Sequence, residues 1–101
     1  MATVYILYSR KLDKYYTGSC LNLEERLKEH IDKKFNHSFT SKADDWDLYY
    51  SINELEYKQA RNIEGHIKKM KSRKYIENLK RFDEMTKRVV EKYKVELTYS
   101  H

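Results

Sequence analysis

Two short apolar runs near the start of the chain, separated by a few polar residues, restrict its fold more than any other feature. The first run, Thr3 to Ser9 (TVYILYS), is rich in the β-branched and aromatic residues that favour strands. The second run, Tyr15 to Cys20 (YYTGSC), follows the polar connection from Lys11 to Lys14. The short gap indicates an antiparallel hairpin. Gly18, inside the second run, is typical of a bulge or of a close approach by another group.

Helical periodicity follows the hairpin. Asn22 is a suitable N-cap with Glu25 at the capping-box position, and apolar residues then recur at every fourth position up to Ile31. A third strand is predicted from Trp46 to Ile52 (WDLYYSI), after an aperiodic loop from Lys33 to Asp45. Three further helices are predicted, from Asn53 or Glu54 to about Lys71, from Lys74 to Lys80, and from about Asp83 to Tyr93.

This order, β-β-α-β-α-α plus a C-terminal helix, predicts an α+β domain with a small three-stranded antiparallel sheet flanked by helices. Arg26 and His30 lie on the margin of the apolar stripe of their helix, and Glu64 lies about 80° from the centre of its own stripe. All three can therefore reach a cleft beside the core. The residues expected to face inward on the later helices are Ala60, Ile63, Ile67, Met70, Tyr75, Ile76, Leu79, Phe82, Met85, Val89 and Tyr93.

Composition and charge narrow the class of protein. A chain of 101 residues fits one domain, and an aromatic content of 14% argues against disorder. The formal net charge is +5, and the segment from Tyr57 to Lys94 holds thirteen basic against five acidic residues. This excess suggests a polyanionic partner. A solvated face of lysine-rich helices explains the charge equally well.

The cysteine content and the hydropathy pattern bear on location. Cys20 is the only cysteine, which excludes an intramolecular disulfide and a cysteine-rich metal site and suits a reducing compartment. The N-terminus lacks the charged and apolar pattern of a signal peptide. No stretch approaches the roughly 18 apolar residues of a membrane span. We therefore expect a cytoplasmic protein that makes no membrane contact.

An ordered set of residues on these elements resembles a known family. The strand pair carries Thr3-Val4-Tyr5 and Tyr16-Thr17-Gly18, the next helix carries Arg26 and His30, and the segment ARNIEGHIKK from Ala60 to Lys69 contains Glu64. In this order, the set resembles the GIY-YIG nuclease family over roughly Thr3 to Leu79. The chain departs from the family pattern at Thr3, Thr17 and Ser19, the last of which replaces a lysine found in some members. We expect a nuclease domain over residues 1–82, with residues 83–101 forming a helical extension and tail.

The resemblance implies a metal-dependent endonuclease that hydrolyses DNA phosphodiester bonds, in a family of repair, homing and restriction nucleases. The implied cofactor is Mg²⁺ or Mn²⁺, held by Glu64. Arg26 would clamp a phosphate through its planar fork. Tyr5 would be the general base, although a phenol is a poor base unless a nearby cation, such as the metal or Arg26, lowers its pKa. The implied catalytic set is Tyr5, Tyr16, Arg26, His30 and Glu64.

Each of these residues also has an ordinary structural explanation. From its position alone, Glu64 could be a surface residue paired with Lys68. Arg26 could likewise be the ion-pair partner of a nearby glutamate. The two tyrosines read as core or strand-face residues, while Tyr16 could instead orient the phosphate or the water. His30 could assist Tyr5, bind the phosphate, or simply pack. His66 points about 160° away from Glu64 on a helix and is a weaker candidate.

A basic segment follows Glu64 and would hold flanking DNA phosphates without reading sequence. Its residues are Lys68, Lys69, Lys71, Arg73 and Lys74. Trp46 or Phe39 could stack on a base, although packing is the simpler role for both. Two other functions stay open. One is a non-catalytic nucleic-acid-binding domain, which Ser19 slightly favours; the other is a protein-interaction domain that uses the apolar stripe of the last helix. Cleavage of both DNA strands would require a homodimer, a partner or two events.

Overall fold

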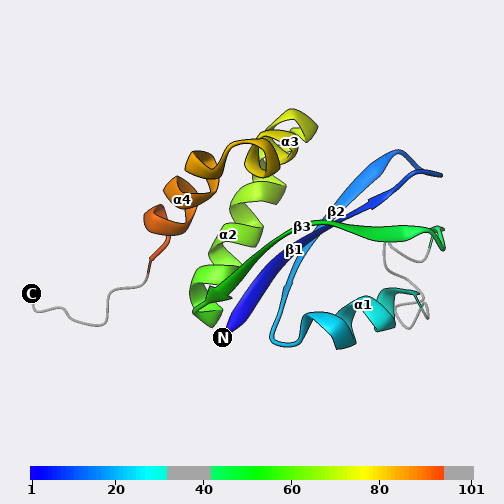
Figure 1. The fold of residues 1–101 in the computed structure, drawn as a ribbon, viewed down its shortest axis with the longest axis horizontal. Helices are drawn as coiled ribbons and strands as arrows, with labels where there is room; N and C mark the ends of the chain where they lie inside the picture. Colours follow the sequence, from blue (N-terminus) through cyan, green and yellow to red (C-terminus); the bar gives the residue numbers. More distant parts are fainter. Residues whose placement is uncertain (32–41, 95–101) are drawn as a thin grey trace, which may run out of the picture.

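The computed structural model describes residues 1–31 and 42–94, and within them it confirms the predicted α+β fold (Figure 1). The helices and strands follow one another in the predicted order. The strands are β1 (Ala2–Ser9), β2 (Lys14–Cys20) and β3 (Trp46–Leu55). The helices are α1 (Leu23–Ile31), α2 (Tyr57–Met70), α3 (Arg73–Arg81) and α4 (Asp83–Lys92).

The three strands form one antiparallel sheet in the order β2-β1-β3. The predicted hairpin pairs β1 with β2, and its register places Tyr5 opposite Gly18 and Leu7 opposite Tyr16. Helix α1 covers one face of the sheet, whereas α2, α3 and α4 lie on the other face (Figure 1). Because β2 is an edge strand, groups from both faces can meet along it.

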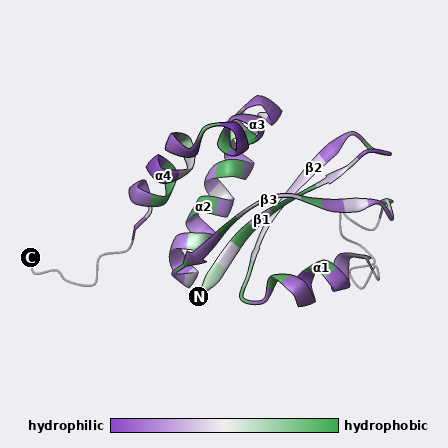
Figure 2. Cartoon of the chain, viewed as in Figure 1, coloured by the Kyte–Doolittle hydropathy of each residue, from purple (hydrophilic) through white to green (hydrophobic). Residues whose placement is uncertain are grey.

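Strand β1 is buried on both faces, which explains why its sequence is a nearly continuous apolar run. Val4 and Ile6 point to the α2 side, where they join a core that includes Ile63. Tyr5 and Leu7 point to the α1 side. In Figure 2 the hydrophobic colour runs along β1 between the two helical layers, while α3 and α4 are largely hydrophilic.

The junction between β3 and α2 differs from the prediction. The strand continues to Leu55, whose side chain is 2% exposed, and the helix begins only at Tyr57. Glu54 adopts a left-handed backbone conformation with φ of 59° just before the strand ends. Glu56 then caps the helix in a reciprocal box with Gln59. Glutamate is an unusual N-cap residue, so the true start carried no strong sequence signal.

Two predicted inward-facing residues are exposed. Met70 is 44% exposed at the end of α2, where Lys71 turns the chain into the left-handed region, and Phe82 is 48% exposed between α3 and α4. The rest of the last stripe packs on the chain's own core. Val89 is buried, and Met85 and Tyr93 are partly buried against the same cluster. Core packing therefore accounts for this stripe without a partner protein.

The structure also bears on the proposed base-stacking residues and on the absence of a predicted membrane span. Trp46 is buried in the α1-side core, which confirms the packing role that was preferred for it over stacking on a base. Phe39, most of the predicted loop and the C-terminal tail fall within residues 32–41 and 95–101, outside the described residues. Among the described helices, none has the length and apolar content needed to cross a membrane.

Candidate active site

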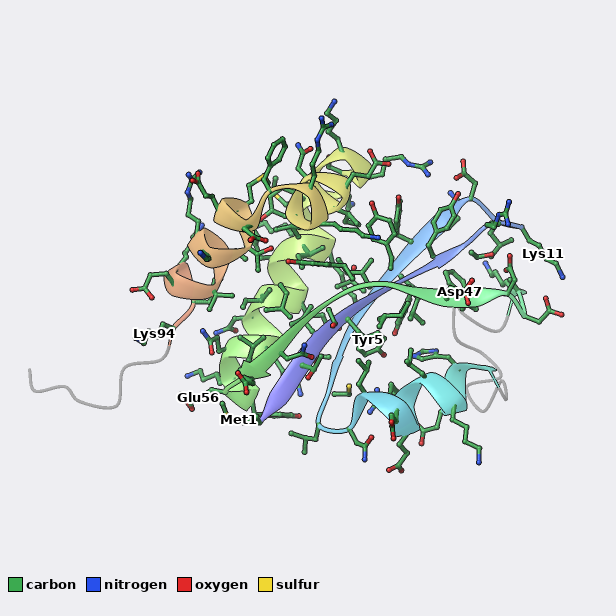
Figure 3. The ribbon with its side chains drawn as sticks, in the orientation of Figure 1. Met1, Tyr5, Lys11, Asp47, Glu56 and Lys94 are labelled. Atoms are coloured by element: carbon green, nitrogen blue, oxygen red, sulfur yellow. The ribbon has the colours of Figure 1, made fainter. Side chains whose placement is uncertain are left out.

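A buried hydrogen bond joins Tyr5 on β1 to His30 on α1. The Tyr5 hydroxyl lies 2.9 Å from His30 Nε2, and the two residues are 1% and 3% exposed. Figure 3 shows Tyr5 between the sheet and α1. His30, expected at the margin of its helix's stripe, is in fact fully enclosed. This enclosure controls the protonation of both groups.

Burial raises the pKa of Tyr5 above its ordinary value, and the nearby Tyr16 adds to this effect. Arg26 lowers the pKa of Tyr5, as the sequence suggested, but burial outweighs it. Burial, followed by the positive charge of Arg26, lowers the pKa of His30. Both groups are therefore uncharged at neutral pH. Arg26 alone therefore does not make Tyr5 acidic.

Gly18 closes the space above the Tyr5 hydroxyl. A Cβ atom at Gly18 would lie 2.5 Å from the Tyr5 hydroxyl oxygen and 2.6 Å from its Cζ. These distances are far below van der Waals contact, so only glycine fits opposite Tyr5. The close approach predicted at Gly18 is therefore confirmed, and its cause is the tyrosine ring across the hairpin.

Tyr16 lies on the same face of the sheet as Tyr5. Its ring centroid is 6.4 Å from that of Tyr5 and 5.3 Å from that of His30. Tyr15 points to the opposite face, as strand alternation predicts, and packs at 5.0 Å from the Tyr49 ring. Tyr5, Tyr16 and His30 thus form one cluster between the sheet and α1, which we call the tyrosine–histidine cluster.

A hollow of about 510 Å³ opens beside this cluster, at the end of β2 between α1 and α2. We call it the catalytic hollow because two of the candidate catalytic residues, Arg26 and Glu64, line it. Arg26 reaches it from α1 and Glu64 reaches it from α2. Its lining residues are Ser19, Cys20, Leu21, Asn22, Glu25, Arg26, Glu29, Tyr57, Arg61 and Glu64.

Two hydrogen bonds fix the carboxylate of Glu64. Ser19 Oγ donates to one oxygen at 2.5 Å, and Lys68 Nζ donates to the other at 2.7 Å. The Glu64 side chain keeps 21% of its surface exposed. Ser19, noted in the sequence as a missing lysine, therefore orients the carboxylate. The pairing with Lys68 is the one that helical spacing predicted.

Arg26 joins the tyrosine–histidine cluster to the catalytic hollow. Its Nε lies 3.2 Å from a carboxylate oxygen of Glu29, one turn further along α1. Its guanidinium also interacts with the Tyr5 hydroxyl, which is why it lowers the pKa of that phenol. The Asn22 side chain caps α1 by accepting from the Glu25 amide at 3.0 Å, and thereby sets where the helix presents Arg26.

Comparison with models of protein families shows to which family the chain belongs. The family model of the GIY-YIG catalytic domain matches residues 1–80. The chain belongs to the GIY-YIG family. Domains of this family are generally nucleases. No curated protein and no solved structure gave a significant match.

The candidate site residues of this GIY-YIG domain are divided among a buried cluster and two hollows along the edge strand. We expected all five candidate residues around one hollow, but only Arg26 and Glu64 line the catalytic hollow. Tyr5 and His30 are buried behind Arg26. Tyr16 lines a second hollow of about 500 Å³, and Lys68 Nζ lies 5.5 Å from the centroid of its ring. Lys68 therefore links the two hollows.

The second hollow of the GIY-YIG domain is rich in basic residues. Lys68, Lys71 and Arg73 line it together with Lys14, which the sequence analysis missed. Arg73 is also paired with Asp13, at 2.8 and 3.3 Å, and this contact lowers the pKa of Asp13 to about 2. We call this surface the basic hollow.

The remaining basic candidates do not line either hollow. Lys69 and Lys74 are exposed. Burial, followed by the positive charges of Lys92 and Lys69, lowers the pKa of His66. Lys69 follows His66 by three residues and therefore lies on the His66 side of α2. His66 itself bonds the hydroxyls of Tyr75 at 3.2 Å and Tyr93 at 3.0 Å. His66 lines neither hollow, in agreement with the prediction that it points away from Glu64.

The donor groups of the catalytic hollow fit a hydrated divalent cation. The described residues contain no cluster of three or more His, Cys, Asp or Glu side chains able to hold a metal. Mg²⁺ is commonly held by one carboxylate, waters and a substrate phosphate, and Glu64 offers such a carboxylate. The hollow also carries three carboxylates against two guanidiniums, so a bound phosphate would need an added cation to balance the charge.

Sequence reasoning missed Tyr57 and Arg61 as lining residues. Both precede Glu64 at spacings that place them on its face of a helix, Tyr57 seven residues and Arg61 three residues back along the chain. The signal was therefore available. It was overlooked because the predicted helix began three or four residues too early, which left Tyr57 without a distinct position at its N-terminus.

Proposed function

We propose that this GIY-YIG domain is a divalent-metal-dependent endonuclease that hydrolyses DNA phosphodiester bonds. One observation carries the proposal. Arg26 and Glu64, from helices on opposite faces of the sheet, meet in one hollow directly beside the buried Tyr5–His30 pair. Phosphodiester hydrolysis needs charge stabilisation and a proton acceptor close together. Here the Arg26 guanidinium, which lines the hollow, also interacts with the hydroxyl of Tyr5, the candidate proton acceptor.

Arg26 is proposed to bind the scissile phosphate. Its guanidinium carries five N–H donors in a planar fork, which suits contact with two oxygens of one phosphate. The partly exposed side chain lines the hollow and is held from behind by the Tyr5 hydroxyl. A clamp held in this way loses little rotamer entropy when the phosphate binds.

Tyr5 and His30 are proposed to act together as the base. The attacking water must lose a proton, and a neutral phenol cannot accept one while it keeps its own. His30 Nε2, at 2.9 Å, can take the Tyr5 proton as the phenol oxygen accepts the proton of the water. Arg26 stabilises the negative charge that develops on the phenol oxygen. Tyr16, beside both rings, is proposed to orient the water or the phosphate.

Glu64 is proposed to hold the divalent ion, with Ser19 fixing one oxygen of its carboxylate. When bound, Mg²⁺ or Mn²⁺ supplies positive charge to the phosphoryl oxygens and to the leaving group. Lys68 Nζ lies 2.7 Å from the same carboxylate, and this ion pair supports the proposal that a positive charge is favoured there. Lys68 is 49% exposed, so its ammonium can move away into solvent.

Cleavage by the purified wild-type chain is the experiment that tests the proposal. With Mg²⁺ or Mn²⁺ we expect nicking of supercoiled plasmid or cutting of branched DNA, and EDTA should stop it. Product ends and rates are followed on gels. If no DNA form is cut while binding persists, the domain is a non-catalytic nucleic-acid-binding module instead.

The basic hollow is proposed to hold DNA phosphates next to the scissile one, and Lys71 provides a specific prediction. Lys71→Asn removes one charge and keeps a residue that tolerates the left-handed backbone of Lys71, with φ of 47°. We expect the slope of log binding constant against log salt to become shallower by about 0.7 to 0.9, the loss of one phosphate contact.

Lys69→Gln is the matched control for Lys71→Asn. It removes the same charge two residues away, on the side of α2 that faces His66. Its salt slope should equal that of the wild type in a fluorescence anisotropy titration. Equal effects of both variants would mean that DNA senses only the net charge, and would remove the basic hollow from the proposal.

A further inference from the structure

Four functional side chains form one stripe along α2. Tyr57, Arg61, Glu64 and Lys68 follow one another at intervals of four, three and four residues. At 100° per residue they span about 60° of the helix circumference. The buried stripe of the same helix, Ala60, Ile63 and Ile67, lies on another side. Core packing therefore does not dictate the residue types of the functional stripe.

The stripe consists of two contacting pairs. Lys68 and Glu64 form the ion pair at 2.7 Å. Arg61 Nη1 donates to the Tyr57 hydroxyl at 3.1 Å, and the Arg61 guanidinium lies 5.7 Å from the centroid of the Tyr57 ring. The second pair lines the catalytic hollow on the side away from Lys68. A cation and an aromatic ring are thus held together beside the candidate catalytic carboxylate.

Tyr57 is unusually open for such a large side chain. It is 55% exposed and belongs to neither core cluster of the described residues. The hydrogen bond from Arg61 restrains the ring, so stacking on it would sacrifice little further side-chain freedom. Arg61 uses one of its five N–H donors on Tyr57, which leaves others for a phosphate. A restrained exposed ring beside a guanidinium is suited to a nucleotide.

We propose that Tyr57 and Arg61 form a nucleotide subsite, in which Tyr57 stacks on an unpaired base and Arg61 binds the adjoining phosphate. The assignment rests on the proposed nuclease function and adds its substrate class. Seven residues of helix separate Tyr57 from Glu64, a rise of about 10 Å. At ~3.4 Å per nucleotide in a duplex strand, and more when extended, the subsite lies one to three nucleotides from the scissile phosphate.

The stacking partner determines the class of DNA. In a duplex both faces of each base are already covered by neighbouring bases, so an aromatic side chain can stack only on a base that has left the helix. The preferred substrate is therefore DNA with unpaired nucleotides beside the cut, such as a flap, a single-stranded tail or a bulge. A continuous matched duplex would leave the subsite empty.

The experiment measures stacking directly in the full chain. The Glu64→Gln protein is titrated with end-labelled oligodeoxythymidines that carry one 2-aminopurine, placed at each position in turn. We expect the 2-aminopurine fluorescence to be quenched at one or two adjacent positions. Binding is followed separately by the anisotropy of the end label. Uniform quenching at every position, or none at any, would overturn the subsite.

Tyr57→Leu, made in the Glu64→Gln protein, is the decisive variant. It should abolish the positional quench and weaken the binding of single-stranded or flapped DNA by about 5- to 150-fold, the range for loss of one stacked base. Binding of matched duplex should stay unchanged. Phe82→Leu is a matched control, because Phe82 is 48% exposed with the Arg81 guanidinium 5.4 Å from its ring centroid, yet lies between α3 and α4. It should leave both readouts unchanged.

Two results separate this subsite from the nuclease proposal. If the wild type cuts DNA but Tyr57→Leu cuts flapped and matched duplex in the same ratio as the wild type, the subsite is wrong and the nuclease stands. If no DNA is cut by the wild type while the quench disappears with Tyr57→Leu, the subsite stands on a binding domain. Equal loss of duplex and single-strand binding in Tyr57→Leu would also overturn the subsite.

Discussion

Glu64→Gln is expected to reduce DNA cleavage by at least about 100- to 1000-fold while changing DNA binding only a few-fold. Glutamine keeps an oxygen that can accept the Ser19 hydroxyl, so the side chain stays in place. It loses the negative charge that would hold the divalent ion, and removal of one electrostatic group from an active site costs rates of this size. Nicking of supercoiled plasmid with Mg²⁺ measures the first effect, and anisotropy without metal measures the second.

Glu25→Gln provides the control for Glu64→Gln. Glu25 lines the same catalytic hollow but is exposed on α1, so its substitution removes an equal charge without touching the proposed ligand. Cleavage by Glu25→Gln should stay within a few-fold of the wild type. A similar loss in both variants would mean that the overall charge of the hollow matters and that Glu64 has no special role. Unchanged cleavage by Glu64→Gln would point to a contaminating nuclease.

The arrangement of helices and strands could be predicted because it follows from local patterns. The strand β1 alternates between two cores, and α1 and α2 repeat their apolar residues at helical spacing. The order of the elements and the hairpin were therefore accessible. The end of β3 was not, because Asn53 and Glu54 are poor strand formers that the pairing of Leu55 with Ala2 carries into the sheet. Tertiary pairing overrode local preference there.

The identities of the candidate site residues were accessible, but their environments were not. The residues next to Tyr5 in the sequence do not predict that Gly18 and His30 enclose its hydroxyl, because both come from other elements. The sequence could therefore suggest that Arg26 lowers the pKa of Tyr5, but not that burial outweighs it. Protonation depends on the balance of desolvation against charge, and desolvation is a property of the packed chain.

The sequence likewise did not show which residues of the basic segment line the basic hollow. Lys69 and Lys71 are two residues apart, and only the direction in which each leaves the end of α2 decides which lines the basic hollow. That direction depends on the left-handed turn at Lys71. The excess of positive charge predicted a polyanionic partner, but it did not distinguish the lysines that would contact this partner from the others. Geometry now reduces the proposed contacts to Lys14, Lys68, Lys71 and Arg73.

Gly18→Ala is expected to destabilise the domain and to disable the proposed base at the same time. The added methyl would lie 2.5 Å from the Tyr5 hydroxyl oxygen, so either the ring or the strand pair must move. Tyr5 is 1% exposed, so its ring cannot shift without displacing packed neighbours. Overpacking of this kind lowers the free energy of unfolding by about 1–3 kcal/mol. For a domain of this size that corresponds to a fall in Tm of about 4–8 °C per kcal/mol.

The catalytic consequence follows from the displacement of Tyr5. A shift of the ring breaks its 2.9 Å hydrogen bond to His30 and moves the phenol away from Arg26. A misplacement of about 1 Å at a reacting group can reduce the rate by about 100-fold. We expect a loss of at least this size in the plasmid nicking assay, measured at a temperature where urea or thermal melting shows the variant to be fully folded.

Gly65→Ala is the control that isolates this contact, because the same methyl group should have the opposite effect on stability. Gly65 is exposed in the middle of α2, and no heavy atom lies within 4 Å of its added Cβ. Alanine there should raise the free energy of unfolding by about 0.5–1 kcal/mol through helix propensity and leave cleavage unchanged. A Gly18→Ala protein as stable and active as Gly65→Ala would mean that the Tyr5 hydroxyl is not confined by β2. The paired proton acceptor built on that confinement would then have to be abandoned, whereas the assignment of Glu64 would survive.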